Sequence, residues 1–538
     1  MNTLTVVKLS DECIQYILEF YLNLYVSRFK YLSSVLGSVS LVCQRWNERI
    51  LPKVTINHNV NITTVEDFET MIIFVRMGIR FKKDVCFNNF LTAGSTNMGL
   101  ALHLFSKPIV RSTINTMVFG NPHYDRHPDN MVYENLRKLV ISDKRSYAAN
   151  YNIALPLRDI YPPSELIKHL DIVLTNTTEN YQSMTNLINN LLNKYYCIDE
   201  IRIKVNSSKN DYIVRMLPLY PNILSKLLYL QIFHGVLHEE SLYQIIHSPL
   251  CKLNALGLEM KTYHKDENDT QLYFSVFNWV ENHKTIHNLS LVYPNYNISL
   301  KSIINLLSKN KVLKNLTLQY AMLEDQEEDY GLWSNDTLTT LSMEITELSF
   351  KYLNNIVTPL NALNRLTVRC WNSSIDLEVF KPTKPLTISM TLLYNAKTLE
   401  RLLTDPQITF SKYIRDLTIN CRKPPTFVEY MSIDAIEFGR VINLLNSKPN
   451  IDQLVIAFPN ELFKTLVESI MNNITIRYLS LYFNNSKNMF EIYKSFHKLI
   501  QQNTLITLKI SLKITRELKK LILENKVIKR IYAIDKDY

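Results

Sequence analysis

Residues 313–343 read LKNLTLQYAMLEDQEEDYGLWSNDTLTTLSM and contain one short pattern twice. In LKNLTL (313–318) and LTTLSM (338–343), apolar residues hold the first, fourth and sixth positions, and the second copy begins 25 residues after the first. The last three positions alternate apolar, polar and apolar, which is the period of a β-strand with one buried face. A unit this short cannot bury its apolar face alone. The recurrence of the pattern therefore predicts a stack of similar units.

The same pattern recurs along most of the chain. Other clear copies are LRKLVI (136–141), IKHLDI (167–172), LLYLQI (227–232), LNALGL (253–258), IHNLSL (286–291), LNRLTV (363–368), IRDLTI (414–419), IDQLVI (451–456) and IRYLSL (476–481). Weaker copies begin at Leu51, Ile114, Leu505 and Ile528, and one ends at Ile203. Seven of the ten steps between neighbouring clear copies run from 25 to 33 residues, and weaker copies or longer units account for the others, so we predict repeat units over residues 51–538.

The segments between the copies carry apolar residues at helical spacing. Examples are residues 181–195, 300–310, 461–473 and 516–526. A strand of period 2 followed by a helix of period 3.6, many times over, predicts an α/β solenoid with short parallel strands on one face and helices on the other. An ordinary α/β domain is the alternative, but its buried strands read as nearly continuous apolar runs, whereas polar residues interrupt these strands, which we expect to be about three residues long.

The pattern resembles that of the leucine-rich-repeat family over about nine tenths of the chain. In that family's pattern, LxxLxLxxN/C, asparagine or cysteine follows the third apolar position by three residues. Asn59, Asn206 and Asn484 stand at that place, but most other copies have a different residue there. The incomplete asparagine series predicts irregular curvature and loops, notably around residues 85–130 and 370–412.

Glycine and cysteine contents bear on chemistry and compartment. The chain of 538 residues has only 9 glycines and contains neither GxGxxG nor a Walker-type GxxxxGK[ST] sequence, so nucleotide-dependent catalysis is not expected. Its 7 cysteines are scattered without a CxxC pair, which is typical of reduced thiols in the cytoplasm or nucleus. We expect no signal peptide and no membrane-spanning segment, because no apolar stretch is long enough.

The basic excess is modest and dispersed. Lysine and arginine number 60 against 50 acidic residues, a formal net charge of +10, without a dense basic block. Such an excess is typical of a solvated surface, so nucleic-acid binding is not the expected function.

Two groups of residues have the side-chain types of metal ligands. They are His123 with Asp125, His127 and Asp129, and His234 with His238 and Glu239. The first group lies between two prolines and the second spans a predicted strand end, so neither is expected to present its ligands on one helix face. GxSxG is also absent. We therefore expect no metal, no cofactor and no enzymatic activity.

Residues 9–50 differ from the repeats that follow, and residues 1–8 form a short tail before them. LSDECIQYILEFY (9–21) and SLVCQRWNERI (40–50) carry apolar residues at helical spacing, and Ser10 or Asp11 can cap the first helix. Helices this short need a surface to pack against.

The same segment resembles the F-box, whose pattern runs Leu-Pro-x-Glu, an Ile-Leu pair and a Leu-Val-Cys-x-x-Trp-type ending. The chain has Leu9-Ser10-Asp11-Glu12, Ile17-Leu18 and Leu41-Val42-Cys43-Gln44-Arg45-Trp46. Ser10 replaces the proline, and the gap between Leu18 and Cys43 is longer than usual. The combination is similar to the F-box proteins with leucine-rich repeats of social amoebae. The alternative is that residues 9–50 only cap the open end of the repeats.

The resemblance implies a substrate-recognition subunit of an SCF-type ubiquitin ligase. Its F-box would dock a Skp-type adaptor held by a cullin, and its repeats would bind a target protein without catalysing a reaction. The implied adaptor-binding residues are Leu9, Ile14, Ile17, Leu18, Val42 and Trp46. The candidate target-binding residues are arginines and tyrosines at outward strand positions, types enriched at binding hot spots: Arg202, Tyr229, Arg365, Arg415, Arg477 and Tyr478. A repeat scaffold without any ubiquitin ligase is the alternative function.

Overall fold

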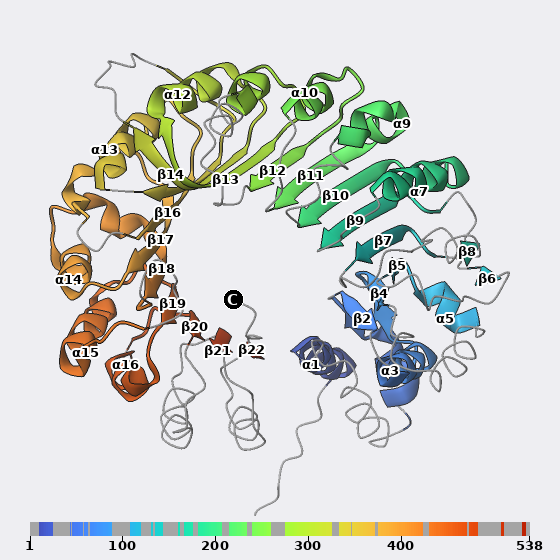
Figure 1. Cartoon of the computed structure of the whole chain (residues 1–538). Helices are drawn as coiled ribbons and strands as arrows, with labels where there is room; N and C mark the ends of the chain where they lie inside the picture. The colour runs from blue at the N-terminus through green and yellow to red at the C-terminus, as the bar shows by residue number, and fades with distance from the viewer. Residues whose placement is uncertain are drawn as a thin grey trace, which may run out of the picture. The chain divides into compact units, whose positions relative to one another are not determined.

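The computed structural model of the chain describes residues 10–24, 44, 46–57, 59–62, 65–88, 108–119, 131–132, 135–143, 160–161, 166–175, 181–206, 215–233, 239–259, 275–324, 333–345, 347–371, 375–422, 430–470, 473–482, 507–510 and 530–533. The chain divides into two units, Met1–Lys261 and Thr262–Tyr538. Each unit contains a parallel sheet, and helices connect many of its successive strands (Figure 1).

The sheet of the first unit is parallel between all neighbours. Its strands are, in order, β2 (Val60–Ile62), β4 (Val85–Asn88), β5 (Thr116–Phe119), β7 (Lys138–Asp143), β9 (His169–Thr175), β10 (Glu200–Asn206), β11 (Leu227–Phe233) and β12 (Ala255–Glu259). Two short parallel pairs accompany it, β1 (Thr55–Ile56) with β3 (Arg80–Phe81) and β6 (Met131–Val132) with β8 (Ile160–Tyr161). The helices of this unit are α1 (Asp11–Leu24), α3 (Val65–Arg76), α5 (Pro108–Thr113), α7 (Tyr181–Lys194), α9 (Pro221–Leu224) and α10 (Glu239–His247). Among them, α7, α9 and α10 lie on the same side of the sheet (Figure 1).

In the second unit the strands pair in sequence order. They are β13 (Asn288–Ser299), β14 (Asn315–Glu324), β15 (Thr340–Ile345), β16 (Arg365–Cys370), β17 (Thr387–Leu393), β18 (Ile414–Asn420), β19 (Gln453–Ala457), β20 (Tyr478–Tyr482), β21 (Thr507–Ile510) and β22 (Arg530–Ala533). The helices α12 (Leu300–Lys309), α13 (Glu347–Ile356), α14 (Ala396–Thr404), α15 (Ala435–Asn443) and α16 (Phe463–Ile470) lie on one side of this sheet (Figure 1). The predicted α/β arrangement of parallel strands and helices is confirmed, and it is compatible with a solenoid.

The apolar positions of the repeated pattern stack across neighbouring strands. One buried row is Leu316, Leu341, Leu366 and Ile388, and the next is Leu318, Met343, Val368 and Met390. Each of these side chains is at most 1% exposed. Burial of one such side chain contributes about 1.5–3 kcal/mol, so the rows stabilise the stack that no single unit could form.

The helices bury the face that their spacing predicted. In α12 the buried residues Leu300, Ile303, Ile304 and Leu307 follow the i, i+3, i+4, i+7 pattern. Predicted helices at 181–195, 300–310 and 461–473 correspond to α7, α12 and α16, while 516–526 lies outside the described residues. Within the described ranges, no helix is both long enough and apolar enough to cross a lipid bilayer.

The prediction of irregular loops over residues 370–412 is wrong. This stretch contains β17 and α14 and continues the sheet, because β17 pairs in parallel with β16 and, with a register shift between Ile388 and Ser389, with β18. The strand β17 does not match the sequence pattern, because Pro385 stands at the first apolar position and only Ile388 and Met390 occupy the other two. Strands are also longer than predicted, since polar positions pair as well; β10, for example, has seven residues.

Elsewhere, residues 85–130 contain β4, α5 and β5, and residues 89–107 and 120–130 lie outside the described residues.

A buried asparagine series stands before the strands of the second unit, at a place different from that of the leucine-rich-repeat pattern. It consists of Asn310, Asn335, Asn361 and Asn473, which are 1%, 1%, 6% and 1% exposed. The side-chain oxygen of Asn335 accepts hydrogen bonds from the N–H groups of Thr337 (3.0 Å) and Leu338 (2.6 Å), which shapes the turn into β15.

In Asn335 and Asn473 the amide nitrogen reaches the preceding repeat. Asn335 Nδ2 donates to the carbonyl oxygen of Leu307 (2.5 Å), near the end of α12. Asn473 repeats the arrangement, donating to the carbonyl oxygen of Leu445 (3.2 Å) and accepting from the N–H of Ile476 (2.7 Å). Asn335 and Asn473 thus each satisfy buried backbone groups of two consecutive units. Asn361 differs, because its Nδ2 donates to the carbonyl oxygen of Ile356 (2.9 Å) and its Oδ1 accepts from the N–H of Asn335 (2.8 Å).

Candidate functional site

The helix α1 begins as the sequence predicted. The Oγ atom of Ser10 accepts a hydrogen bond from the N–H of Cys13 (3.2 Å), so Ser10 caps the helix. Asp11 and Glu12 occupy the first turn, where their charges interact favourably with the helix dipole.

One face of α1 packs against the start of the repeats. The Oε1 atom of Glu19 accepts a hydrogen bond from the N–H of Thr55 (2.9 Å), the first residue of β1, and Gln15 Nε2 donates to the carbonyl oxygen of Lys53 (3.2 Å). Leu18 and Leu22 are 6% and 1% exposed. These contacts cover an edge strand that would otherwise present free backbone groups. The helix therefore does act as a cap.

The outward face of α1 exposes large apolar side chains. Tyr16 is 76% exposed and Ile17 is 53% exposed, and Cys13 on the same helix is also exposed. The end unit of a repeat array needs a polar outer face for solubility. The side chains of Tyr16 and Ile17 depart from that requirement.

The described adaptor-binding candidates gather at this end of the first unit. Ile14 is half-buried, Ile17 is exposed and Leu18 is buried, all on α1. Trp46 is half-buried and begins a helical turn, Trp46–Ile50, that lies against α1. The other two candidates, Leu9 and Val42, lie outside the described residues, as do residues 1–8.

Two of the target-binding candidates are neighbours in the first unit. Arg202 in β10 is in register with Tyr229 in β11, and it lies between the buried residues Ile201 and Ile203. Arg202 Nη2 is 3.7 Å from Glu200 Oε2. Tyr229 is half-buried, and burial raises the pKa of its hydroxyl although the charge of Arg202 opposes the shift.

The remaining candidates lie in the second unit. Arg365, Arg415 and Arg477 are exposed, and Tyr478 is 41% exposed. The N–H of Asp452 donates to the carbonyl oxygen of Arg415 (3.1 Å), and the N–H of Arg477 donates to that of Asp452 (2.8 Å), so the three residues occupy equivalent places on consecutive strands. Arg365 begins β16 and is separated from β18 by one strand.

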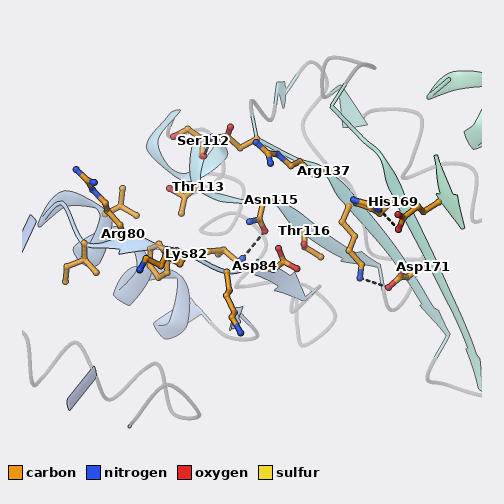
Figure 2. Close-up of a pocket in the computed structure, with 18 of the residues that line it drawn as sticks. Arg80, Lys82, Asp84, Ser112, Thr113, Asn115, Thr116, Arg137, His169 and Asp171 are labelled. Carbon is orange, nitrogen blue, oxygen red and sulfur yellow. Dashed lines mark hydrogen bonds and ion pairs between the residues drawn. The ribbon is translucent and has the colours of Figure 1, made fainter. Parts of the chain in front are cut away.

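A polar pocket of about 820 Å³ lies in the first unit (Figure 2). Its lining comes from the amino ends of successive parallel strands, because Lys138, His169 and Glu200 are the first residues of β7, β9 and β10. Asn115, directly before β5, links two of these strands, since its Oδ1 accepts a hydrogen bond from the N–H of Val85 (2.9 Å). Parallel pairing thus brings residues from five repeats to one edge.

Ion pairs occupy one side of this pocket. Lys138 Nζ is 2.5 Å from Asp171 Oδ2, and His169 Nδ1 is 3.0 Å from Glu200 Oε2. Figure 2 shows His169 and Asp171 on one side of Asn115, with Arg80 and Lys82 on the other. The two carboxylates are therefore already engaged by side chains of the lining.

Four other cations line the pocket and form no ion pair with any residue that the structure describes: Arg80, Lys82, Lys83 and Arg137. All four are exposed. The sequence carries a signal for them, because RFKKD (80–84) and Arg137-Lys138 place basic residues immediately beside predicted or observed strand starts. Among the residues that line this pocket, the sequence pattern predicted only Arg202 as a binding residue.

Among the described residues, no group of three or more His, Cys, Asp or Glu side chains could hold a metal ion. The sequence candidates around His123 and His234 lie outside those residues, apart from Glu239, which begins α10. Cys370 and Cys421 are buried free thiols, and burial raises the pKa of each.

Comparison with known proteins assigns no family. No protein-family model matches the chain, and no curated protein matches it.

Proposed function

We propose that the chain is the substrate-recognition subunit of an SCF-type ubiquitin ligase, in which an F-box at residues 9–50 docks a Skp-type adaptor and leucine-rich repeats bind a target protein. One observation supports this proposal above the others. It is the exposure of Tyr16 (76%) and Ile17 (53%) on the outward face of the end helix.

A capping role accounts for only half of α1. Leu18, Leu22 and Glu19 satisfy the contacts that a cap requires. The opposite face needs a further reason, because exposed large apolar side chains that gather at one place mark interaction surfaces. Ile17 and Leu18 form the Ile-Leu pair of the F-box resemblance, and they divide the two roles: Leu18 packs inward and Ile17 faces outward.

The repeats supply a second surface on a rigid scaffold. Outward strand positions such as Arg202 and Tyr229 in the first unit and Arg415 in the second lie beside buried apolar residues, so the sheet of each unit holds its own side chains in place. Arg and Tyr are enriched at binding hot spots. In such a ligase the chain acts by proximity, since holding a target near the ubiquitin-charged enzyme raises the effective concentration of its lysines. The cytoplasm or nucleus would be its compartment, and no cofactor is needed.

The test is recovery of the adaptor by the full-length chain. We expect the wild-type chain to co-purify with a Skp-type adaptor and a cullin. A Tyr16→Ser/Ile17→Ser variant should recover at least about 10-fold less adaptor, because truncation of a hot-spot residue costs about 2 kcal/mol or more. Ser at both exposed positions leaves the buried face of α1 intact.

The matched control changes two exposed residues elsewhere in the first unit. Tyr196 and Leu219 are 60% and 67% exposed, so Tyr196→Ser/Leu219→Ser removes similar apolar surface away from α1. This control should recover the adaptor as the wild type does. A folded wild-type chain that retains protein partners but no adaptor would instead support the scaffold without a ubiquitin ligase.

A further inference from the structure

We propose that the polar pocket at the amino ends of strands β4 to β10 binds a compact phosphorylated ligand, which it holds through the phosphate groups. The proposal starts from the charge of the lining. Lysine and arginine contribute six cations and the acidic residues three carboxylates, a net charge of +3 with His169 neutral. The cations are Arg80, Lys82, Lys83, Arg137, Lys138 and Arg202, and the carboxylates are Asp84, Asp171 and Glu200.

The ion pairs neutralise positive charge on only one side of the pocket. Asp171 and Glu200 are engaged by Lys138, His169 and Arg202 on one side of the pocket. The four unpaired cations come from β3 and the turn after it, and from the residue before β7. Asp84 is the one carboxylate of the lining that forms no ion pair with any described residue. Four like charges in one cavity repel each other, and a bound anion would relieve that repulsion.

Phosphate suits this arrangement better than a single carboxylate. A phosphate monoester carries a charge of about −1.5 to −2 and three strong acceptor oxygens, so it can bind several of these cations at once. The guanidinium groups of Arg80 and Arg137 can each donate two parallel hydrogen bonds to phosphate oxygens, and Lys82 and Lys83 add point charges.

The size of the pocket favours a compact ligand. Its volume of about 820 Å³ lies within the range of about 300–1,000 Å³ that is typical of small-molecule sites. Ser112, Thr113 and Asn135 also line it and add polar groups. These residues are separate from the outward face of α1, so loss of phosphate binding and loss of adaptor binding are independent results.

Calorimetric titration of the full-length chain with inorganic pyrophosphate tests the proposal. We expect saturable binding that weakens as the salt concentration rises. A Lys82→Gln/Arg137→Gln variant removes one charge from each side of the unpaired group and should raise the Kd about 10- to 100-fold, because hydrogen bonds to charged groups are the stronger class.

A matched control removes one lysine and one arginine from the same unit outside the pocket. Arg76 and Lys252 are exposed and do not line it, so Arg76→Gln/Lys252→Gln should keep the Kd within about 2-fold. No saturable binding of pyrophosphate to the wild type, or an equal loss in both variants, would overturn the proposal.

A retention experiment distinguishes the sources of the phosphate. The immobilised full-length chain is incubated with a pool of short peptides that carry one phosphoserine and, separately, with the same peptides carrying serine or glutamate at that position, and the retained peptides are measured. Selective retention of the phosphorylated pool that the pocket variant loses assigns the site to a modified protein segment, whereas binding of pyrophosphate alone assigns it to a free phosphorylated molecule. Equal retention of the glutamate pool contradicts recognition of phosphate.

Discussion

The side-chain amide of Asn335 donates a hydrogen bond to the backbone carbonyl oxygen of Asn310 (3.2 Å), one buried asparagine of the second unit to the next. Asn310 in turn donates to the carbonyl oxygen of Val280 (2.7 Å). His283 occupies the corresponding place before Ile286, and its Nδ1 accepts from the N–H of that residue (3.3 Å). The buried asparagine series therefore links successive repeats at the turn from helix to strand.

Substitution of Asn335 by alanine should destabilise the second unit by about 1–3 kcal/mol, because it leaves buried backbone groups without partners. Asn305→Ala is the control, since Asn305 is exposed on α12, and it should change the stability by less than about 0.5 kcal/mol. Urea denaturation followed by circular dichroism measures both. Equal midpoints for the two variants would show that the asparagine series does not stabilise the fold.

Gly439→Ala should also destabilise the second unit. A Cβ atom at Gly439 would lie 2.7 Å from Thr465 Cγ2 and 3.3 Å from Ser469 Oγ, where α15 packs against α16. Overpacking of this kind costs about 1–3 kcal/mol. Thr465→Ser removes the clashing methyl group, so the double variant should recover most of the loss in thermal denaturation. If the two effects simply add, the contact is not the cause.

The pair formed by Glu400 and Arg440 predicts a specific dependence on pH. Arg440 Nη1 and Nη2 lie 2.5 and 3.0 Å from the two carboxylate oxygens of Glu400, and this hydrogen bonding holds the pKa of Glu400 below its ordinary value. A lowered folded-state pKa means that the stabilisation is present above the ordinary glutamate pKa and is lost as the pH falls through the folded-state value.

Titration of the Glu400 carboxyl by NMR should therefore show its pKa rising toward the ordinary value in Arg440→Gln. Lys397→Gln on the exposed side of α14 serves as the control and should leave that pKa in place. Because both side chains of the pair are solvent-accessible, we expect little change in thermal stability.

Burial predicts the order in which thiols react. Cys370 and Cys421 are buried, and burial raises the pKa of each, so the reactive thiolate is scarce and shielded. Cys13 is exposed on α1. Native-state alkylation mapped by mass spectrometry should label Cys13 before the other two, and denaturant should remove the difference.

Leu18 and Ile17 should respond differently to truncation. Leu18→Ala removes a side chain that is 6% exposed and should cost about 2–5 kcal/mol of local stability, seen as faster hydrogen exchange in α1. Ile17→Ala should leave exchange almost unchanged, because Ile17 is 53% exposed. Similar exchange in both variants would contradict the division of α1 into an inward and an outward face.

Most strands of the repeats could be predicted because three apolar positions recur in a fixed pattern. The strand β17 could not, since Pro385 replaces the first of them and only the register with β16 reveals the equivalence of Ile388 and Leu366. The short strands β2 and β4 were missed for a related reason, because each keeps too little of the pattern.

The pocket and the asparagine series depend on spatial information that the sequence does not carry directly. Lys138 and His169 are 31 residues apart, and parallel register between β7 and β9 makes them neighbours. The leucine-rich-repeat pattern predicts asparagines after each strand, whereas the buried asparagine series stands before the strands. Of the described adaptor-binding candidates, spacing placed Ile17 and Leu18 on one helix but could not show which of them faces outward.

Strand order in the second unit follows the order of the sequence, so each strand that the structure describes there pairs with the strands immediately before and after it. A repeat can therefore be duplicated or deleted as a cassette, since the pairs on either side re-form across the junction and no distant partner has to change. The number of strands in such a sheet can therefore change during evolution by one repeat at a time.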